Sequence, residues 1–326
     1  MKKVLVTGAT GFLGGHVVRL LQAQGHEPVA LVRASSSTKA LKAVGVTWRE
    51  ASIERGEGLE AALEGIDAVI HAAGLVKARS SLEFHHVNVD GTANLLKAAE
   101  ARGDAIKAFV YVSSLAAHGF RDDGKPRGAD EPSQPVTYYG KSKRAGEEVA
   151  LRFASKLPVN ILRPPAIYGP GDREMFAFFQ AARRRVVPFL VSRKHQLSLI
   201  YVEDCARALV QLVESPQPSG SIFAVNDGQA HTQEGLAEAI AHALGVRYVG
   251  VTVPLPVLNA AALVSERYGR FAGKAVMLNR DKVNELKQPY LLSDASSMRG
   301  TGWTPNFDLK RGTEATAKWY RENSWI

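Results

Sequence analysis

Three polar side chains have the types and the spacing for acid–base chemistry. Tyr139 and Lys143 are four residues apart in a segment of helical pattern, so both lie on one helix face. A tyrosine has an ordinary pKa of about 10 and is a poor base at neutral pH, but a cation one turn away favours its phenolate. Ser114 stands at the end of a predicted strand, where its hydroxyl can orient a carbonyl group beside the phenol. These residues predict proton transfer to or from an oxygen atom.

A glycine-rich loop near the start of the chain predicts a dinucleotide site. Residues 7–14 carry Gly8, Gly11 and Gly14 between a short apolar run and a helical pattern. Glycines in that order allow a tight turn, bring the backbone close to a pyrophosphate and let the helix pack closely on the strand. The unpaired amides of the first helical turn then face the anionic oxygens. The position of the loop between strand and helix supports the prediction more than the glycines alone.

The end of the second predicted strand bears on which dinucleotide binds. An acidic residue there binds the adenosine ribose hydroxyls, whereas an arginine can hold a 2′-phosphate. Residues 32–39 contain no carboxylate but include Arg33, Lys39 and several hydroxyl groups. Charge-assisted, bidentate binding of a phosphate by Arg33 therefore favours NADP(H). Stacking of Arg33 on the adenine is the alternative, and NAD(H) remains the second candidate.

Strands and helices alternate along the first half of the chain. Short apolar runs predict strands and longer amphipathic segments predict helices, until a proline-rich stretch at 164–170 interrupts the rhythm. The predicted strands are 3–7, 29–32, 68–70, 108–112 and 159–162, and the predicted helices are 12–24, 87–102, 136–156, 176–185, 204–214 and 234–244. This order predicts an α/β fold with a doubly wound parallel sheet, the Rossmann fold.

Two units follow from this division. Residues 1–164 form the predicted dinucleotide-binding domain, with later contributions from about 198–228. Residues 165–326 form mostly a smaller α/β substrate-binding domain, and the substrate pocket is expected between the two.

Two groups of residues are candidates for contact with a substrate. The apolar stretch 253–258, with Phe176, Phe178 and Phe179, could wall a pocket, and core packing is the alternative. His118 follows the active-site serine closely enough to face the same cleft, and simple packing is again the alternative.

Composition is typical of a compact soluble protein. Of 326 residues, 45% are hydrophobic and 22% are charged. The apolar run 251–264 is shorter than a membrane span and contains two prolines, so no integral membrane segment is expected. The single cysteine, Cys205, allows no internal disulfide and no multi-cysteine metal site. We therefore expect a cytoplasmic protein without a bound metal.

The chain is basic. Lysine and arginine number 41 against 32 aspartate and glutamate residues, which gives a formal net charge of +9. The densest cluster, 183–185, lacks the aromatic residues of a nucleic-acid site, so no nucleic-acid partner is expected. A solvated basic surface is the plain interpretation, and a phosphate-bearing cofactor or substrate is the alternative.

Further motifs complete a family pattern. They lie at 67–74 (DAVIHAAG), 88–96 (NVDGTANLL), 163–170 (RPPAIYGP), 201–204 (YVED) and 302–305 (GWTP). Together with the glycine loop, Ser114, Tyr139 and Lys143, they make the sequence resemble the extended short-chain dehydrogenases/reductases, the NAD-dependent epimerase/dehydratase family, nearly from end to end.

The resemblance implies roles for individual residues. Tyr139 would be the acid/base, Lys143 would hold the nicotinamide ribose and lower the pKa of the tyrosine, and Ser114 would polarise the reacting oxygen. The implied cofactor contacts are Gly8, Thr10, Gly11, Phe12, Leu13, Arg33, Ile53, Ala72, Ala73, Gly74, Pro164 and Ile167, besides Tyr139 and Lys143. Asn88 would lie near the cofactor or serve packing alone. A homodimer would form through the helices that carry Asn88 and Tyr139.

Departures from the family pattern bear on the substrate. Leu115 and Ala116 follow Ser114 where sugar-nucleotide dehydratases carry an acidic pair, so elimination of water is not expected. Ala166 replaces an asparagine that commonly holds a substrate diphosphate in epimerases, and Leu-Ser at 197–198 stands where an arginine is common.

These losses favour the reductase branch of the family. Each charged hydrogen bond that is missing from a diphosphate forfeits about 1.5–3 kcal/mol, although residues 193–195 could compensate. The sequence therefore looks most like dihydroflavonol-reductase-like, 3β-hydroxysteroid-dehydrogenase-like and aldehyde-reductase-like proteins.

Three functions are compared on this basis. The first is an NADP(H)-dependent carbonyl reductase or alcohol dehydrogenase acting on a moderately apolar small molecule. The second is a nucleotide-sugar epimerase with tightly held NAD, which would consume no added NADPH. The third is an NADP(H)-sensing regulatory protein without turnover. The complete catalytic set argues against the third, because a sensor needs only the glycine loop.

Overall fold

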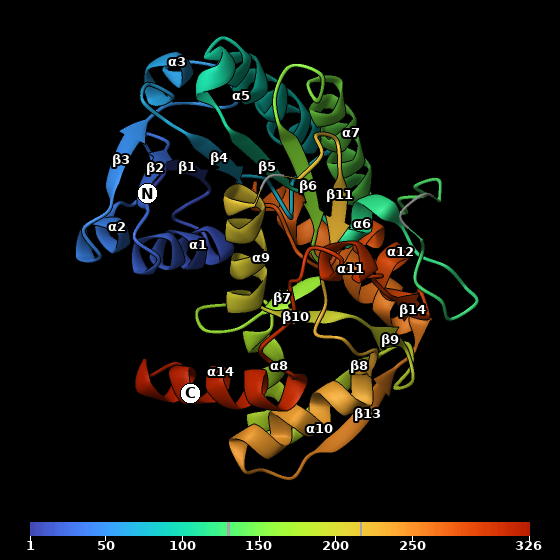
Figure 1. The fold of residues 1–326 in the computed structure, drawn as a ribbon. Helices are drawn as coiled ribbons and strands as arrows, with labels where there is room; N and C mark the ends of the chain where they lie inside the picture. Colours follow the sequence, from blue (N-terminus) through green and yellow to red (C-terminus); the bar gives the residue numbers. More distant parts are fainter. Residues whose placement is uncertain (129–130, 216) are drawn as a thin grey trace.

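A seven-stranded parallel sheet forms the centre of the molecule (Figure 1). The computed structural model describes residues 1–128, 131–215 and 217–326. The strands follow the order β11-β6-β5-β4-β1-β2-β3, and neighbouring strands run parallel. Their bounds are β1 (Lys3–Thr7), β2 (Glu27–Val32), β3 (Thr47–Glu50), β4 (Ala68–His71), β5 (Ala108–Val112), β6 (Val159–Arg163) and β11 (Ile222–Ala224). The predicted doubly wound parallel sheet is confirmed.

Helices cover both faces of this sheet. Val4 and Val6 of β1 belong to the core shared with α1 and α9, whereas Leu5 belongs to the core shared with α3, α5 and α7. Successive side chains of a strand point to opposite faces, so a strand buried on both sides is apolar throughout. The helix bounds are α1 (Phe12–Ala23), α3 (Leu59–Ala62), α5 (Gly91–Glu100), α7 (Tyr138–Arg152) and α9 (Val202–Glu214).

Several short elements carry no periodic signal in the sequence. β3 lies at the sheet edge with mostly exposed, polar residues, so no apolar run marks it. The helix predicted at 87–102 begins instead with a π-helical turn that precedes α5. The bounds are α2 (Lys39–Ala43), α4 (Ser81–His85), the π-helical turn η1 (His86–Asp90), the 3₁₀ turn η2 (Gly103–Ala105) and α6 (Leu115–His118).

The second half of the chain builds small sheets around a further core. β10 pairs with β7, β9 pairs with β12 and β14, and β13 pairs with β8. α8, α10 and α14 pack together over this core. The bounds are β7 (Ala166–Tyr168), α8 (Phe176–Arg183), β8 (Val186–Leu190), β9 (Gln196–Leu197), β10 (Leu199–Tyr201), β12 (His231–Thr232), α10 (Gln233–Leu244), β13 (Val249–Val253), α11 (Leu255–Phe271), α12 (Arg280–Leu286), β14 (Tyr290–Leu291), α13 (Ser296–Arg299) and α14 (Leu309–Glu322).

Part of the apolar set named as a possible pocket wall packs in the core. Phe179 is fully buried, and its ring lies 5.1 Å from that of Tyr320 on α14. Leu258 packs in a separate small cluster with Val283 of α12. For these two side chains the structure shows the alternative of core packing, and the pocket wall stays a prediction for the rest of the set.

Two glycines let α7 approach its neighbours closely. A Cβ atom at Gly140 would overlap the carbonyl oxygen of Ala116 in α6. At Gly146 it would overlap the Tyr111 hydroxyl on β5 and lie 2.8 Å from the carbonyl oxygen of Asn88. Helix α7 carries Tyr139 and Lys143, so this close packing fixes their distance from the sheet.

We predict that Gly146→Ala destabilises the protein by about 1–3 kcal/mol, because the added methyl group forces α7 away from β5. Thermal or denaturant unfolding measures the change. Gly15→Ala in α1 is the matched control, since a Cβ atom there would make only ordinary contacts of 3.7 Å or more, and its stability should stay equal or rise. Equal stability of wild type and Gly146→Ala would contradict the packing argument.

Candidate active site

The glycine loop lies tightly against the end of strand β4. Gly8 has a φ of +69°, and a Cβ atom there would stand 2.9 Å from the backbone of Ala72 and of Ala73. The Gly11 amide donates to the Gly8 carbonyl oxygen at 2.9 Å, which closes the turn. A Cβ atom at Gly14 would overlap the same oxygen. The loop therefore has the tight turn and the close helix–strand packing that the sequence predicts.

The start of α1 suits an anionic ligand. Its cap residue Gly11 contributes no side chain, and its first turn, which the structure describes in full, holds no acidic residue. The amides of Phe12 and Leu13 thus meet no competing side-chain oxygen from the cap. Thr10 and Gly11 are exposed at the tip of the loop, and Gly74 is exposed beside it. These residues fit the pyrophosphate of a dinucleotide.

A chain of buried hydrogen bonds fixes the backbone at the end of β4. The Ala73 amide donates to Thr7 Oγ1 at 3.0 Å, and Thr7 Oγ1 lies 2.7 Å from His71 Nδ1. His71 Nε2 lies 3.0 Å from Thr92 Oγ1, which donates to the Asn88 carbonyl oxygen at 2.8 Å. Every group finds a partner only if Nε2 carries the imidazole proton and Nδ1 accepts from Thr7.

Burial keeps this histidine neutral. It lowers the pKa of His71 to about 3, and the nearby Lys143 acts in the same direction. The sequence motif at 67–74 contains His71, but nothing in the sequence assigns it a role, because its partners come from β1 and α5.

Asn88 ties the loop after β4 to helix α7. Its Oδ1 accepts from the Leu75 amide at 2.7 Å, and its Nδ2 donates to the Leu75 carbonyl oxygen at 3.0 Å and to Ser142 Oγ at 2.9 Å. A Cβ atom at Gly74 would lie 3.0 Å from Asn88 Oδ1 and 3.6 Å from Lys143 Nζ. These bonds give Asn88 a structural role, and its place near the cofactor stays a prediction.

Ser114, Tyr139 and Lys143 meet at the carboxyl edge of β5. Ser114 follows β5 and caps α6, where its Oγ accepts from the Ala116 amide at 3.1 Å. Tyr139 lies in the first turn of α7, and its ring is 6.0 Å from that of Phe84 on α4. Lys143 Nζ donates to the Val112 carbonyl oxygen at 2.5 Å. The predicted catalytic residues are thus brought together.

The pKa values of Tyr139 and Lys143 differ from what the family resemblance implied. Burial raises the pKa of Tyr139 to about 12, and the Ser114 hydroxyl offsets part of this rise. Burial also lowers the pKa of Lys143 to about 7, although Glu147 opposes the shift. The ammonium group points to the Val112 carbonyl oxygen and lies 4.5 Å from the centre of the Tyr111 ring. The expectation that Lys143 lowers the pKa of the tyrosine is therefore not met in this arrangement.

Three further predicted contacts are buried or partly buried. Pro164 is buried, and its carbonyl oxygen accepts from the Leu115 amide at 2.8 Å, so it holds the turn that carries Ser114. Ile167 is partly buried in β7 and packs on the sheet core. Ile53 is buried, and its carbonyl oxygen accepts from Asn94 Nδ2 at 2.9 Å.

Arg33 stands exposed beside a carboxylate that the sequence pattern did not reveal. Its guanidinium lies 3.7 Å from a Glu54 carboxylate oxygen, and its side chain is 63% exposed. Its amide donates to Ser36 Oγ at 3.2 Å. Glu54 belongs to the loop after β3, so only the pairing of β2 with β3 brings it to the end of β2.

A hollow opens beside the Tyr139 ring. Apolar side chains of α4 and of the segment before α12 form part of it, and charged side chains form the rest. Its lining residues are Val76, Lys77, Phe84, Thr137, Tyr139, Met277, Asn279, Asp281, Lys282 and Glu285. Asp281 also accepts from the Tyr138 amide at 2.9 Å, which links α12 to the start of α7. This hollow lies directly next to the phenol ring.

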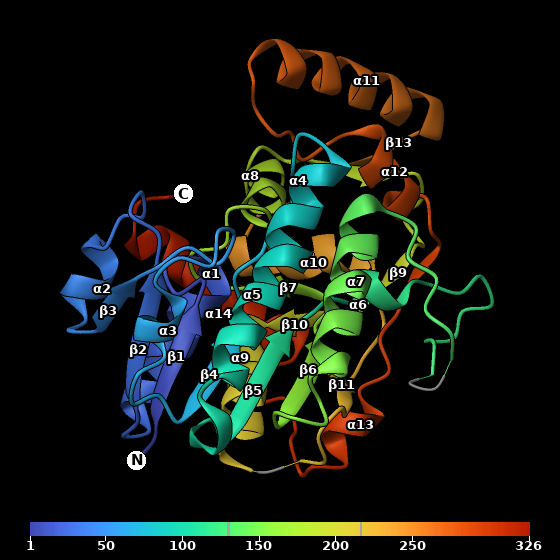
Figure 2. The same ribbon diagram turned by 90° about the horizontal axis from the view of Figure 1, so that it is seen from above.

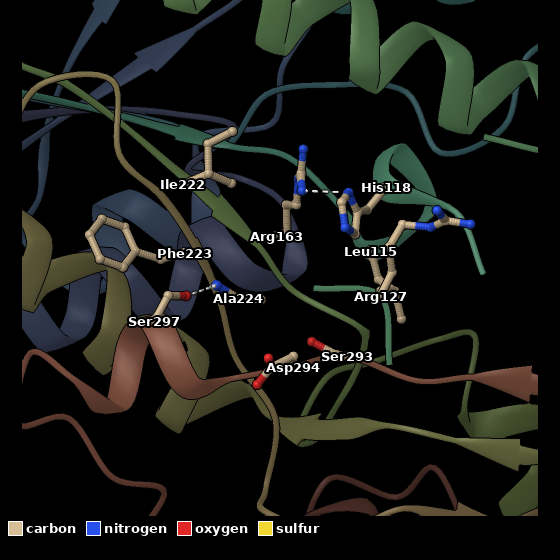
Figure 3. A pocket seen from close by; sticks show the side chains of 10 residues that line it. All are labelled: Leu115, His118, Arg127, Arg163, Ile222, Phe223, Ala224, Ser293, Asp294 and Ser297. Atoms are coloured by element: carbon tan, nitrogen blue, oxygen red, sulfur yellow. Dashed lines mark hydrogen bonds between the residues drawn. The ribbon is translucent and has the colours of Figure 1, made fainter. Parts of the chain in front are cut away.

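A second hollow lies on the other side of α6 (Figure 3). Arg163 there bonds the buried Glu147 at 2.7 and 2.8 Å and approaches His118 Nδ1 at 2.7 Å. His118 Nε2 bonds the Gly128 carbonyl oxygen at 2.9 Å, and burial lowers the pKa of this imidazole to about 4. His118 lines this second hollow and is not among the residues that line the Tyr139 hollow. Within the described ranges, no group of three or more His, Cys, Asp or Glu side chains is arranged to hold a metal ion.

Comparison with known proteins decides the family. Residues 4–226 match the model of the NAD dependent epimerase/dehydratase family. The chain belongs to this family. The family resemblance that the sequence motifs predicted is confirmed.

Two relatives and one solved structure illustrate the range of this family. Ceramide reductase of Caulobacter vibrioides is 34% identical over 331 residues, which cover 99% of this chain and 96% of that protein. UDP-glucose 4-epimerase of Vibrio cholerae is 26% identical over 97% of this chain and 95% of its own. MoeE5, solved with UDP-glucuronic acid and NAD, is 25% identical with a TM-score of 0.77, and the match covers 98% of this chain and 99% of that one.

Family and site together define the class of enzyme. This epimerase/dehydratase family member is an NAD(P)-dependent oxidoreductase of the extended short-chain dehydrogenase/reductase type, and it uses a nicotinamide cofactor. The uncapped start of α1 and the glycine cradle at Gly8 fit that group.

We predict that Lys143→Met raises the thermal stability of the cofactor-free protein by several degrees at pH 7 while removing turnover. The folded protein holds the pKa of Lys143 near 7, below the ordinary value of about 10.4, so the unfolded chain binds the extra proton between these values. Wild-type stability therefore falls as the pH drops from about 10.4 to 7, and the advantage of the variant grows over the same window.

Melting curves at several pH values measure this advantage. Lys141→Met is the matched control, because Lys141 is exposed on the same helix and should show no such pH dependence. If the difference in melting temperature between Lys143→Met and wild type does not change with pH, the pKa of Lys143 is not lowered in the folded protein.

Proposed function

We propose that this enzyme is an NADP(H)-dependent carbonyl reductase, reversible as an alcohol dehydrogenase, whose substrate carries its carbonyl group on an apolar body. The observation that carries the proposal is the meeting of Ser114, Tyr139 and Lys143 beside a partly apolar hollow. The large sheet would bind the cofactor and the second half of the chain would supply most of the substrate contacts. This division of roles is the one that we expected from the sequence, and it stays part of the proposal.

The residues divide the reduction between them. The nicotinamide, when bound, supplies a hydride to the carbonyl carbon. Ser114 would orient the carbonyl oxygen, and Tyr139 would donate its phenolic proton to that oxygen, which completes the alcohol. With a pKa near 12, Tyr139 is protonated at neutral pH, as a proton donor must be. Lys143 would hold the nicotinamide ribose.

The lining of the hollow indicates an amphiphilic substrate. Val76, Phe84 and Met277 offer apolar contacts, while Lys77 and Glu285 offer charged ones. The relative with 34% identity is named a ceramide reductase, and another relative at 26% identity is named a 2-alkyl-3-oxoalkanoate reductase. We infer a molecule with a polar head near the reacting carbonyl and an apolar chain.

The structure offers little to hold a sugar nucleotide. Arg193, considered as a substitute anchor, bonds the Gly250 carbonyl oxygen at 2.7 Å and Glu234 at 3.3 Å, so its charge is already engaged. Ser198 is buried, and its Oγ accepts from the Ser293 amide at 3.0 Å. These contacts support a reductase over the epimerase alternative, although one relative is named a UDP-glucose 4-epimerase.

A cytoplasmic location and a homodimer are further parts of the proposal. A cytoplasmic location is supported by the single cysteine, which is buried and free. A homodimer would use the exposed faces of α5 and α7. A measurement of mass in solution tests the dimer directly.

We predict that Tyr139→Phe lowers the rate of NADPH-dependent carbonyl reduction by two to four orders of magnitude, because the proton donor is lost. Dinucleotide affinity, measured by the heat-stability shift on binding, should change little. Tyr138→Phe is the matched control, since Tyr138 is 52% exposed on the preceding position and should retain activity. Unchanged turnover in Tyr139→Phe would end the proposal, and product formation without net NADPH consumption would support the epimerase.

We predict that Arg33→Ala raises the KM for NADPH about tenfold and leaves the KM for NADH nearly unchanged, because only NADPH has the 2′-phosphate. Glu54→Gln should lower the KM for NADPH, since it removes the carboxylate 3.7 Å from the guanidinium. Steady-state kinetics with both cofactors measure the change, with Arg55→Ala as the control for loss of a neighbouring exposed arginine. Equal effects of Arg33→Ala on both cofactors would instead indicate adenine stacking.

A further inference from the structure

Helix α11 projects from the rest of the fold and exposes apolar side chains. Figure 2 shows it standing apart beyond β13 and α12. It spans 17 residues, Leu255–Phe271. Four of its large side chains are solvent-exposed: Val257 at 55%, Val264 at 68%, Tyr268 at 64% and Phe271 at 93%. Such exposure on one helix usually marks a binding surface.

The exposed apolar residues form one stripe along the helix. Val257, Val264, Tyr268 and Phe271 are separated by seven, four and three residues, the spacing of a single helix face. Ala260 and Ala261, on the same face, are exposed too. The opposite side of the helix buries Leu258, Ala262 and Gly269. We call the exposed face the α11 stripe.

Positive charge flanks the stripe. Arg267 and Arg270 lie along one side of it, and Lys274 follows the end of the helix. These three cations have no salt-bridge partner among the residues that the structure describes. Glu266 is the one acidic residue of α11, and it turns away to pair with Arg280 at 3.0 Å. An apolar face bordered by cations fits the headgroup region of an anionic bilayer.

The stripe is coupled to the substrate hollow. The segment after α11 folds back on the buried side of the helix, because a Cβ atom at Gly269 would stand 2.9 Å from the Lys274 carbonyl oxygen. This segment then supplies Met277 to the Tyr139 hollow, and α12 supplies Asp281 and Glu285. A surface that binds α11 would therefore also constrain the segment after α11 and helix α12, which line the hollow.

We propose that the α11 stripe docks this enzyme on the surface of an anionic lipid bilayer. The apolar side chains would enter the interface while the arginines bind lipid phosphates. Among the described residues, no helix has both the length and the apolar character to span a membrane, so the contact is with one surface. A parallel pair of α11 helices from two copies would bring Arg267 and Arg270 of both copies together, and the test below separates any pairing of copies from docking.

Docking also explains how an amphiphile reaches the Tyr139 hollow, and this part rests on the proposed function. A substrate held in the bilayer would pass to the hollow past α12 without entering water. The docking itself does not depend on catalysis and is measured separately.

The test is flotation of the full chain with vesicles of phosphatidylglycerol and of phosphatidylcholine. We expect binding to the phosphatidylglycerol vesicles and little to phosphatidylcholine. The double variant Val264→Asp/Phe271→Asp should lower the bound fraction at least tenfold, and Arg267→Gln/Arg270→Gln should weaken binding to phosphatidylglycerol at low salt. Val44→Asp and Lys310→Gln are controls for apolar and charged surface changes elsewhere, and they should bind as wild type does.

Melting temperature and turnover of a water-soluble carbonyl compound should stay unchanged in the α11 variants, which shows that they fold. Absence of wild-type binding to phosphatidylglycerol vesicles would overturn docking. So would a wild-type dimer that Phe271→Asp dissociates without any vesicle binding, because the stripe would then join two copies. Vesicle binding by a protein that reduces no carbonyl would leave docking in place and refute the proposed function.

Discussion

The burial of the Lys143 ammonium group is the constraint on which the site depends. A cation out of water costs free energy, and the surroundings offset that cost with the Val112 carbonyl oxygen and the face of the Tyr111 ring. These partners belong to β5, so α7 must lie close to that strand. Gly146 makes the approach geometrically feasible. The buried cation in turn helps keep His71 neutral, which gives the hydrogen-bond chain beneath the glycine loop a single arrangement.

Two contacts hold the catalytic residues and the loop beside them in place. Asn88 joins the loop after β4 to α7, and Pro164 holds the turn of Ser114. Such contacts concern the backbone and the catalytic set, not the reacting molecule. The residues that line the hollow come from 76–84, from the start of α7 and from 277–285.

Local patterns in the sequence predict the five inner strands of the sheet well, because these strands are buried on both faces and therefore mostly apolar. They miss the two edge strands, β3 and β11. They also predict the catalytic set, since Tyr139 and Lys143 share one helix. Local patterns do not predict contacts between segments that are distant in the sequence. Glu54 reaches Arg33 only through the pairing of β2 with β3, and His118 turns to Arg163 because of a bond across 45 residues. Local patterns also do not predict the solvent exposure of α11, because an amphipathic pattern does not show whether the rest of the protein covers the apolar face.

The last strand of the central sheet has a consequence for biosynthesis. β11 joins the edge of β6 from residues 222–224, long after the other strands have been made. A growing polypeptide thus carries an open β6 edge until the chain has been translated as far as residue 224. Unpaired strand edges recruit other strands. The nascent protein therefore passes through a stage at which chaperone protection matters most.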